Sequence, residues 1–395
     1  MFLTRRALAL ALFPTAPLLA AACTSAATES ADGGRSGGGS DGPIAVTSTD
    51  DECRLAATSA PAGAVTFAVT NDGGQVTEFY LLAADGVAVV GEVENIGPGV
   101  SRQLTVEVDP GRYVAACKPG MAGDGIRADF TVTEAGATAT TVGAERAAQL
   151  ATATAAYERF VQTEAAALAD KTGQFAQLVI AGDDEAARTL YPDARTHWER
   201  IEPVAESFGD LDPRLDLREA DLEPGQTWTG WHALEKELWP PAEGYAPLSP
   251  DQRRNLADKL VTDTDELVAR VADLELTPSQ LGNGAKELLD EVATGKVTGE
   301  EEIWSHTDLW DFQANVDGAR AAFEALEPVV TAEDPDLAAT LTERFEAIDA
   351  ELGQHRTGDA FAFYDALDPA QVNRLAAAVD ALSEPLSRLT VTVVA

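Results

Sequence analysis

The hydrophobic pattern of this 395-residue chain changes its period near Gly143, and this change restricts the available folds more than any other feature. Between residues 44 and about 133, apolar and polar residues alternate, as in Ala64 to Val69, which is the pattern of half-buried strands. Beyond Gly143, apolar residues such as Leu150 and Tyr157 recur at helical spacing. We therefore expect a multidomain protein, an all-β sandwich followed by an all-α helical bundle.

Turn-forming sequences divide both parts of the chain. In the first part, Asn71 to Gly74 and Asp109 to Gly111 interrupt the alternating runs at the intervals of a small β-sandwich. In the second part, breaks such as Gly182 to Asp184 and Trp239 to Pro241 leave about seven or eight helical segments, which favours antiparallel bundle packing. Outside the first residues, no apolar run is long enough to predict a membrane-spanning helix.

Composition indicates a globular protein with an unusual charge. Apolar residues make up 45% of the chain and charged residues 24%, which is enough apolar material for a sizeable interior. The 66 acidic residues outnumber the 28 basic ones and give a formal charge of -38, which repels phosphate backbones and excludes nucleic-acid binding. The same field attracts cations, although most of these carboxylates are expected on a solvated surface.

The start of the chain predicts export from the cytoplasm. Residues 1–23, MFLTRRALALALFPTAPLLAAAC, combine a basic start, an apolar segment and small residues before a cysteine, as in an export signal. LLAAAC resembles a bacterial lipobox with Cys23 as the lipidated residue, although Ala20 replaces the usual leucine. Residues 24–43 contain almost no large apolar side chain and predict a flexible tether that spans roughly 25 Å on average. We expect a periplasmic or cell-surface location with a lipid anchor.

Three cysteines in an exported chain leave one without a partner, and assigning Cys23 to lipid removes the imbalance. Cys53 and Cys117 then remain as a pair, for which a disulfide is the ordinary outcome in an oxidising compartment. The alternative is a metal site that contains both thiols in reduced form with nearby Glu78 or Glu94.

A second metal, copper or iron, in the β part is a weaker hypothesis. The segment from Cys117 to Met121 resembles the end of a cupredoxin loop that runs from a cysteine to a methionine. Residues 44–133 contain no histidine, however, and a blue-copper centre needs two. An electron-transfer copper site of the usual kind is therefore excluded.

The stretch TGWHALEKELW places His232 three residues before Glu235. On a helix, positions three apart share one face, so both side chains can point into one site. Glu199 and Glu202 repeat this spacing in HWERIEP, on a stretch predicted to be a neighbouring helix. Bundles build iron and manganese sites from such carboxylates and Glu/His pairs. The alternative reading is a pair of exposed helix faces that form salt bridges.

Several long stretches carry a family resemblance. These are HWERIEPVAESFGDLDPRLDLREAD, TGWHALEKELW and GKVTGEEEIWSHTDLWDFQANVDG in the helical part, with GEVENIGPG and PGRYVAAC in the β part. They resemble the imelysin family, and within it the EfeO-type iron-uptake lipoproteins that carry an N-terminal cupredoxin-like domain. The resemblance implies a cupredoxin-like domain at 44–135 and an imelysin-like helical domain at 144–395.

The function that this resemblance implies is the capture of iron, as Fe²⁺ or Fe³⁺, outside the cytoplasmic membrane. The implied partners are a membrane iron permease of the EfeU type and a secreted haem peroxidase of the EfeB type. The family's HxxE motif matches His232 and Glu235. The further acidic candidates for metal binding fall on Glu199, Glu202, Asp216, Glu301 and Glu291.

Two other functions compete with iron capture. The imelysin name is linked to peptidases through HxxE, so an HxxE metal-dependent peptidase is the main alternative. The sequence has neither HExxH nor an evident serine or cysteine nucleophile, and we therefore do not expect an enzyme. A structural or polysaccharide-binding surface protein is the third reading, and the lack of aromatic repeats argues against it.

Overall fold

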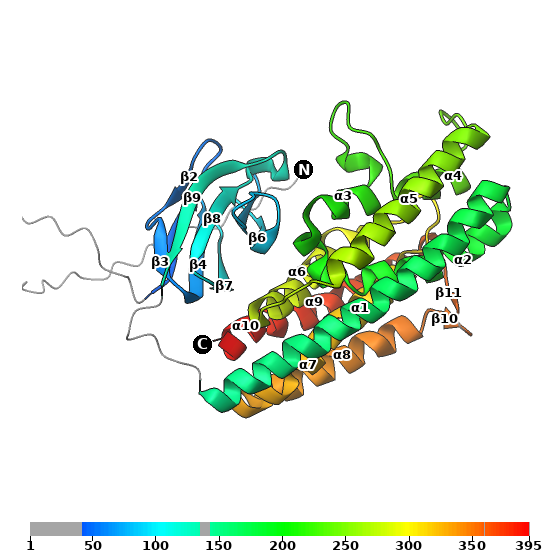
Figure 1. The fold of residues 1–395 in the computed structure, drawn as a ribbon. Coiled ribbons are helices and arrows are strands. Elements are labelled where there is room, and N and C mark those ends of the chain that lie inside the picture. Colours follow the sequence, from blue (N-terminus) through cyan, green and yellow to red (C-terminus); the bar gives the residue numbers. More distant parts are fainter. Residues whose placement is uncertain (1–41, 135–142, 359, 395) are drawn as a thin grey trace, which may run out of the picture. The chain divides into compact units, whose positions relative to one another are not determined.

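The computed structural model describes residues 42–134, 143–358 and 360–394 (Figure 1). The predicted export signal at 1–23, the predicted lipidation site Cys23 and all but the end of the predicted tether at 24–43 lie outside the described residues. Within the described residues, no helix combines the length and the apolar composition needed to cross a membrane.

The first part of the described chain is built from two β-sheets. The first sheet has the order β2 (Cys53–Leu55), β1 (Ile44–Ser48), β4 (Gly63–Asn71) and β7 (Ser101–Val108). The second has the order β3 (Ser59–Pro61), β9 (Ile126–Thr133), β8 (Gly111–Cys117), β5 (Thr77–Leu82) and β6 (Val89–Ile96), and a short 3-10 helix, η1 (Pro119–Met121), follows β8. The pairs β1 with β4 and β3 with β9 are parallel, and the other pairs are antiparallel.

The alternation in the sequence places one face of each sheet in a shared core. On β4, Val65, Phe67 and Val69 are buried and the residues between them are only partly buried. The Phe67 ring lies 5.2 Å from the rings of Phe79 and Phe130 on the second sheet. The predicted all-β sandwich is confirmed, and its fold fits a cupredoxin-like domain.

A disulfide joins Cys53 on β2 to Cys117 on β8 and so links the two sheets. The structure therefore differs from the alternative in which both thiols are reduced and bind a metal. Cross-linking residues 64 positions apart restricts the unfolded chain and stabilises the sandwich.

Helices make up the second part, which confirms the predicted all-α region. The α-helices are α1 (Ala144–Ala181), α2 (Asp184–Glu199), α3 (Asp212–Leu215), α4 (Trp231–Leu238), α5 (Pro250–Val271), α6 (Pro278–Thr294), α7 (Asp308–Glu333), α8 (Pro335–Gly353), α9 (Pro369–Leu386) and α10 (Leu389–Val394). The shorter elements are the 3-10 helices η2 (Glu202–Leu211), η3 (Glu219–Asp221), η4 (Lys296–Thr298) and η5 (Tyr364–Ala366), with strands β10 (Arg356–Thr357) and β11 (Ala360–Phe361).

The long helix α1 organises this part, because it packs along α5, α2 and α7 (Figure 1). Its helical apolar spacing buries Tyr157, Val161 and Leu168 on one face. The helix ends at Gly182, whose φ of 74° allows the left-handed cap that closes the last turn. Side-chain caps begin other helices, for example Ser249 with Gln252 at α5.

The structure differs from the predicted single helix through the run that contains Glu199 and Glu202. Helix α2 ends at Glu199, and Glu202 begins η2. Pro203 explains the break, since proline has no N–H to donate and disfavours the α conformation in the residue before it. Both glutamates nevertheless reach the same buried ammonium group, as described below.

Candidate metal centre

The short helix α4 carries His232 and Glu235 into the interior, where their side chains are 1% and 0% exposed. Gly230, whose φ is 91°, is the residue directly before the helix. A Cβ atom there would lie 2.1 Å from the carbonyl oxygen of Leu215, so the start of α4 touches the backbone directly before Asp216. This close approach brings the histidine of one segment beside the aspartate of another.

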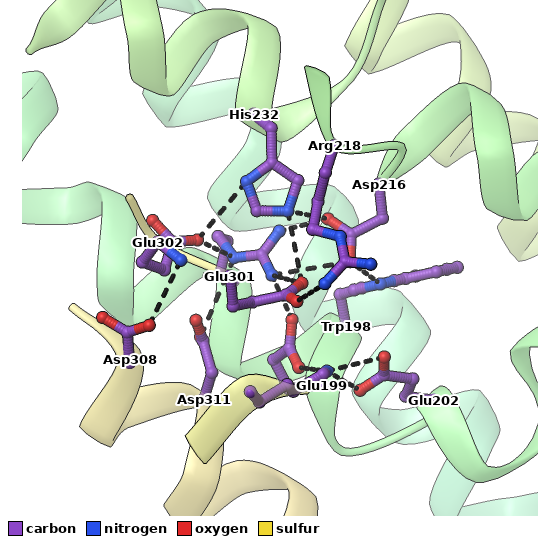
Figure 2. Close-up of polar contacts among 12 residues, drawn as sticks. Trp198, Glu199, Glu202, Asp216, Arg218, His232, Glu301, Glu302, Asp308 and Asp311 are labelled. Carbon is purple, nitrogen blue, oxygen red and sulfur yellow. Dashed lines mark hydrogen bonds and ion pairs between the residues drawn. The ribbon is translucent and has the colours of Figure 1, made fainter. Parts of the chain in front are cut away.

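The two ring nitrogens of His232 meet different carboxylates (Figure 2). Nδ1 lies 3.2 Å from Glu235 Oε2 and 3.8 Å from Glu302 Oε1. Nε2 lies 3.3 Å from Glu301 Oε1 and 3.5 Å from Asp216 Oδ1. Among the described residues, the sets of three ligand-type atoms within 4.8 Å of one another are Asp216 with His232 and Glu301, and His232 with Glu235 and Glu302.

A fully buried guanidinium group, that of Arg195 on α2, crosses the centre. It forms ion pairs with the carboxylates of Glu199, Asp216, Glu301, Glu302 and Asp311. Trp198, one helical turn further along α2, donates from its indole nitrogen to Asp216 Oδ2 at 2.8 Å. One helix face therefore holds acidic side chains that come from four separate segments.

A second buried cation holds the neighbouring pair of carboxylates. The ammonium of Lys296 on η4 lies 3.0 Å from Glu199 Oε2 and 2.7 Å from Glu202 Oε1, and its side chain is fully buried. Asn315 on α7 donates its amide to the same two glutamates at 2.9 and 2.7 Å. These carboxylates are thus already bound by protein donors.

Burial and the charges of neighbouring groups shift the pKa values of the side chains in the centre in different directions. Burial and Arg195 act to lower the pKa of His232, but its carboxylate neighbours outweigh them and hold that pKa well above its ordinary value. Burial acts against ionisation of Glu301, yet Lys296, His232 and Arg195 hold its pKa well below the usual range. Burial, with Glu235 nearby, raises the pKa of Glu302 well above its usual value.

Negative charge exceeds positive charge in this interior. Asp311 is 1% exposed, both of its oxygens accept no hydrogen bond within the described structure, and burial raises its pKa well above normal. Burial likewise raises the pKa of Asp308 and of Glu291 to about 7. Buried carboxylates without sufficient counter-charge favour either protonation or a bound cation.

The residues predicted from the sequence fall into three positions in the structure. His232, Glu235, Asp216 and Glu301 meet at the imidazole. Glu199 and Glu202 lie beside them, paired with Lys296. Glu291 does not contact the imidazole, and shares a cavity lining with Asp216 and Glu301. Their role in metal binding stays a prediction.

Sequence reasoning missed Glu302, Arg195 and Lys296. Glu302 is adjacent to Glu301 in the run GEEE, so the acidic run itself contained a signal for it. The two cations gave no signal, because lysine and arginine are normally exposed and nothing in the sequence marks these two as buried.

Comparisons with known proteins support one family for the chain. The family model described as imelysin, Peptidase_M75, matches residues 153–389. The iron uptake system component EfeO of Escherichia coli O157:H7 is 37% identical over 349 residues, which cover 88% of this chain and 90% of that protein. The proteins of the same name from Escherichia coli strain K12 and Shigella flexneri are 36% identical over the same shares.

Among solved structures, a chain described as the precursor of iron-regulated protein A from Parabacteroides distasonis aligns with a TM-score of 0.48. Its sequence is 14% identical, and the alignment covers 65% of the present chain and 97% of that chain.

Proposed function

The chain belongs to the imelysin family, and from this premise we propose that it is the iron-binding component of an Efe-type uptake system. It captures iron outside the cytoplasm and passes it to a membrane permease of the EfeU type. A secreted haem peroxidase of the EfeB type is the second proposed partner. The export signal and lipidation at Cys23 would keep the protein near that permease.

The observation that carries the proposal is a buried imidazole surrounded by more carboxylates than its cations neutralise. His232 lies within 4 Å of Asp216, Glu235, Glu301 and Glu302. One imidazole with several hard oxygen donors suits iron in either oxidation state better than copper(I), which prefers thiolates and thioethers. The relatives named as iron uptake components point to the same cargo.

Binding is favoured over hydrolysis by the state of Glu235. A metal-dependent peptidase needs a carboxylate that is free to activate a metal-bound water. Glu235 Oε1 instead accepts hydrogen bonds from the backbone N–H groups of Trp304 and Ser305, and Oε2 lies beside His232. We therefore propose a carrier rather than a peptidase.

The test is an iron titration of the full chain, aerobic and anaerobic, with bound metal counted per chain. We expect about one tightly bound iron, at least tenfold weaker binding in His232→Ala, and a loss of binding in Asp216→Asn combined with Glu301→Gln. His355→Ala is the matched control, because His355 is also buried but lies beside Glu351. Iron binding that is equal in His232→Ala and His355→Ala would overturn the assignment of this centre.

A further inference from the structure

His232 belongs to both candidate groups of ligand atoms, but it presents a different nitrogen to each. Its two ring nitrogens point in different directions, so a single ion can be bound by only one of them. Metal-bound histidines in proteins usually donate the N–H of the other nitrogen to a carboxylate or carbonyl. The contacts around the two groups decide which nitrogen has which role.

On the Nδ1 side, the carboxylates accept hydrogen bonds from backbone and hydroxyl donors, and Glu302 also pairs with Arg195 at 2.7 Å. Glu235 accepts from Trp304 N at 3.0 Å and from Ser305 N at 2.7 Å, and it is 0% exposed. Glu302 accepts from Tyr191 Oη at 3.0 Å and from Ser305 Oγ at 2.5 Å. A metal here would have to displace these backbone and hydroxyl donors.

On the Nε2 side, the carboxylates are held mainly by positive charges. Arg195 pairs with Asp216, and Arg195 and Arg218 each lie 3.6 Å from Glu301. A cation that enters here takes over a charge interaction that the arginines already make, and no backbone hydrogen bond has to break.

The Nε2 side is also the accessible side. The side chains of Asp216 and Glu301 are 8% and 5% exposed, whereas those of Glu235 and Glu302 are 0% exposed. Asp216 and Glu301 line a cavity together with Arg218, and neither Glu235 nor Glu302 is among the residues that line it. The carboxylates beside Nε2 therefore face the cavity, whereas those beside Nδ1 do not.

From this asymmetry we infer that Glu235 is a positioning residue and not a ligand of the iron. In the metal-bound state it accepts the Nδ1–H of His232 and fixes the ring orientation, so that Nε2 gives up its proton and offers its lone pair to the ion beside Asp216 and Glu301. Its two backbone hydrogen bonds to the 304–305 turn hold that geometry. The inference rests on the proposed function, because it concerns how the same centre presents its histidine to the metal.

The test is NMR of the full chain labelled with ¹⁵N-histidine and loaded with ¹¹³Cd²⁺ as a diamagnetic probe. Scalar coupling between cadmium and nitrogen identifies the bound atom, and the His232 signals are assigned by their loss in His232→Gln. We expect coupling to Nε2 while Nδ1 keeps its proton. Coupling to Nδ1, or bound cadmium without coupling to His232, overturns the inference and leaves iron binding intact. Failure of iron to displace cadmium from the chain overturns the proposed function itself.

Two variants on the same helix separate positioning from general stability. Glu235→Gln keeps an oxygen for the backbone donors but offers an amide N–H to Nδ1, which favours the opposite tautomer of the ring. We expect about 10–100-fold weaker cadmium binding and loss of the Nε2 coupling. Glu237→Gln is the control, because Glu237 is also buried and accepts from Tyr245 Oη and Leu248 N but does not contact His232. Unchanged affinity and unchanged coupling in Glu235→Gln would show that the carboxylate does not set the tautomer.

Discussion

At the scale of single residues, the centre is defined as much by its buried cations as by its acids. Lys296 donates to both Glu199 and Glu202, which are two of the glutamates that the sequence offers as ligands. A buried ion pair that loses one partner leaves an uncompensated charge, which is far more costly than the pair was stabilising. Lys296 thus occupies the position that a metal would need in order to use these two carboxylates.

We predict that Lys296→Met lowers the free energy of unfolding by about 3–5 kcal/mol in the absence of metal. Added Mn²⁺ should restore part of this loss, because a dication can bind between Glu199 and Glu202 once the ammonium is gone. The measurement is urea unfolding of the variant and the parent with and without Mn²⁺.

Lys286→Met is the matched control for this prediction. Lys286 pairs with Asp290 on the same face of α6 at 2.7 Å, but its side chain is 16% exposed. A pair that still reaches solvent in this way contributes about 0–1 kcal/mol. Equal destabilisation of the two variants, or equal stabilisation of both by Mn²⁺, would show that Lys296 does not hold a cation position.

The sequence predicts the meeting of His232 with Glu235 because helical spacing alone puts them on one face. Spacing alone does not predict that Asp216 and Glu301 meet on the other side of the ring, and only the family resemblance makes these two residues candidates for the same site. That contact depends on a turn before α4 and on an irregular stretch before α7, and no periodic pattern describes either segment. Arg195 and Lys296 are missed for the same reason, since only the completed packing shows that they are buried.

At the scale of elements, Gly230 allows the start of α4, which carries His232, to pack directly against the end of α3, which precedes Asp216. A side chain at Gly230 would overlap the Leu215 carbonyl, and a φ of 91° is unfavourable for any other residue. We predict that Gly230→Ala destabilises the protein by several kcal/mol and weakens iron binding at least tenfold, because α4 and the end of α3 before Asp216 must separate. Thermal unfolding and iron titration measure the two effects.

Gly225→Ala is the control that separates the cost of a positive φ from the cost of the overlap between a Cβ atom and a neighbouring backbone. Gly225 has the same φ of 91°, but a Cβ atom there would have no neighbour within 4 Å. The control should lose only the ~1–2 kcal/mol of the left-handed conformation and should bind iron normally. If both variants lose iron binding to the same extent, the close approach at Gly230 does not position the site.

Helices α1 and α2 are joined by a charged contact outside the centre. Glu164 on α1 accepts from His197 Nδ1 on α2 at 2.7 Å and lies 3.4 Å from Arg200, the residue that follows α2. Burial acts to raise the pKa of Glu164, but these two partners outweigh it and lower that pKa below 4.5. The folded state therefore binds fewer protons than the unfolded chain just below that pH.

Because folding lowers the pKa of Glu164, we predict that the effect of Glu164→Gln on stability depends on pH. The stability that Glu164 contributes is present above the unfolded pKa and is lost as the pH falls through the folded one. The variant should be about 1 kcal/mol less stable near pH 7, and the difference should shrink toward zero below about pH 4. Urea unfolding at both pH values measures it, with the exposed Glu185→Gln as control. A difference that does not change with pH would contradict this account.

At the scale of the whole molecule, the change of hydrophobic period predicts both folds, because strand and helix periods cannot be confused over such long runs. The sequence also shows the strong excess of acidic residues, 66 against 28, but not where that charge is buried. Among the residues that the structure describes, some acidic side chains surround His232 and most of the others lie at least partly on the surface. The field of the surface charge should guide cations toward a centre that itself lacks counter-charge.

If this field guides cations to the centre, the rate of cation binding should depend on salt concentration. Raising the salt concentration from about 10 mM to about 1 M shortens the screening length from about 30 Å to about 3 Å. The association rate of Co²⁺, used as a paramagnetic probe, should fall by about tenfold or more, while its dissociation rate changes little. Stopped-flow tryptophan fluorescence can follow both rates, because the Trp198 indole donates to Asp216 beside the imidazole. The part of the fluorescence change that is lost in Trp198→Phe is the part that Trp198 reports. An association rate that is the same at both salt concentrations would mean that the ion reaches the centre by local contacts alone, and that the charge of -38 has no part in its capture.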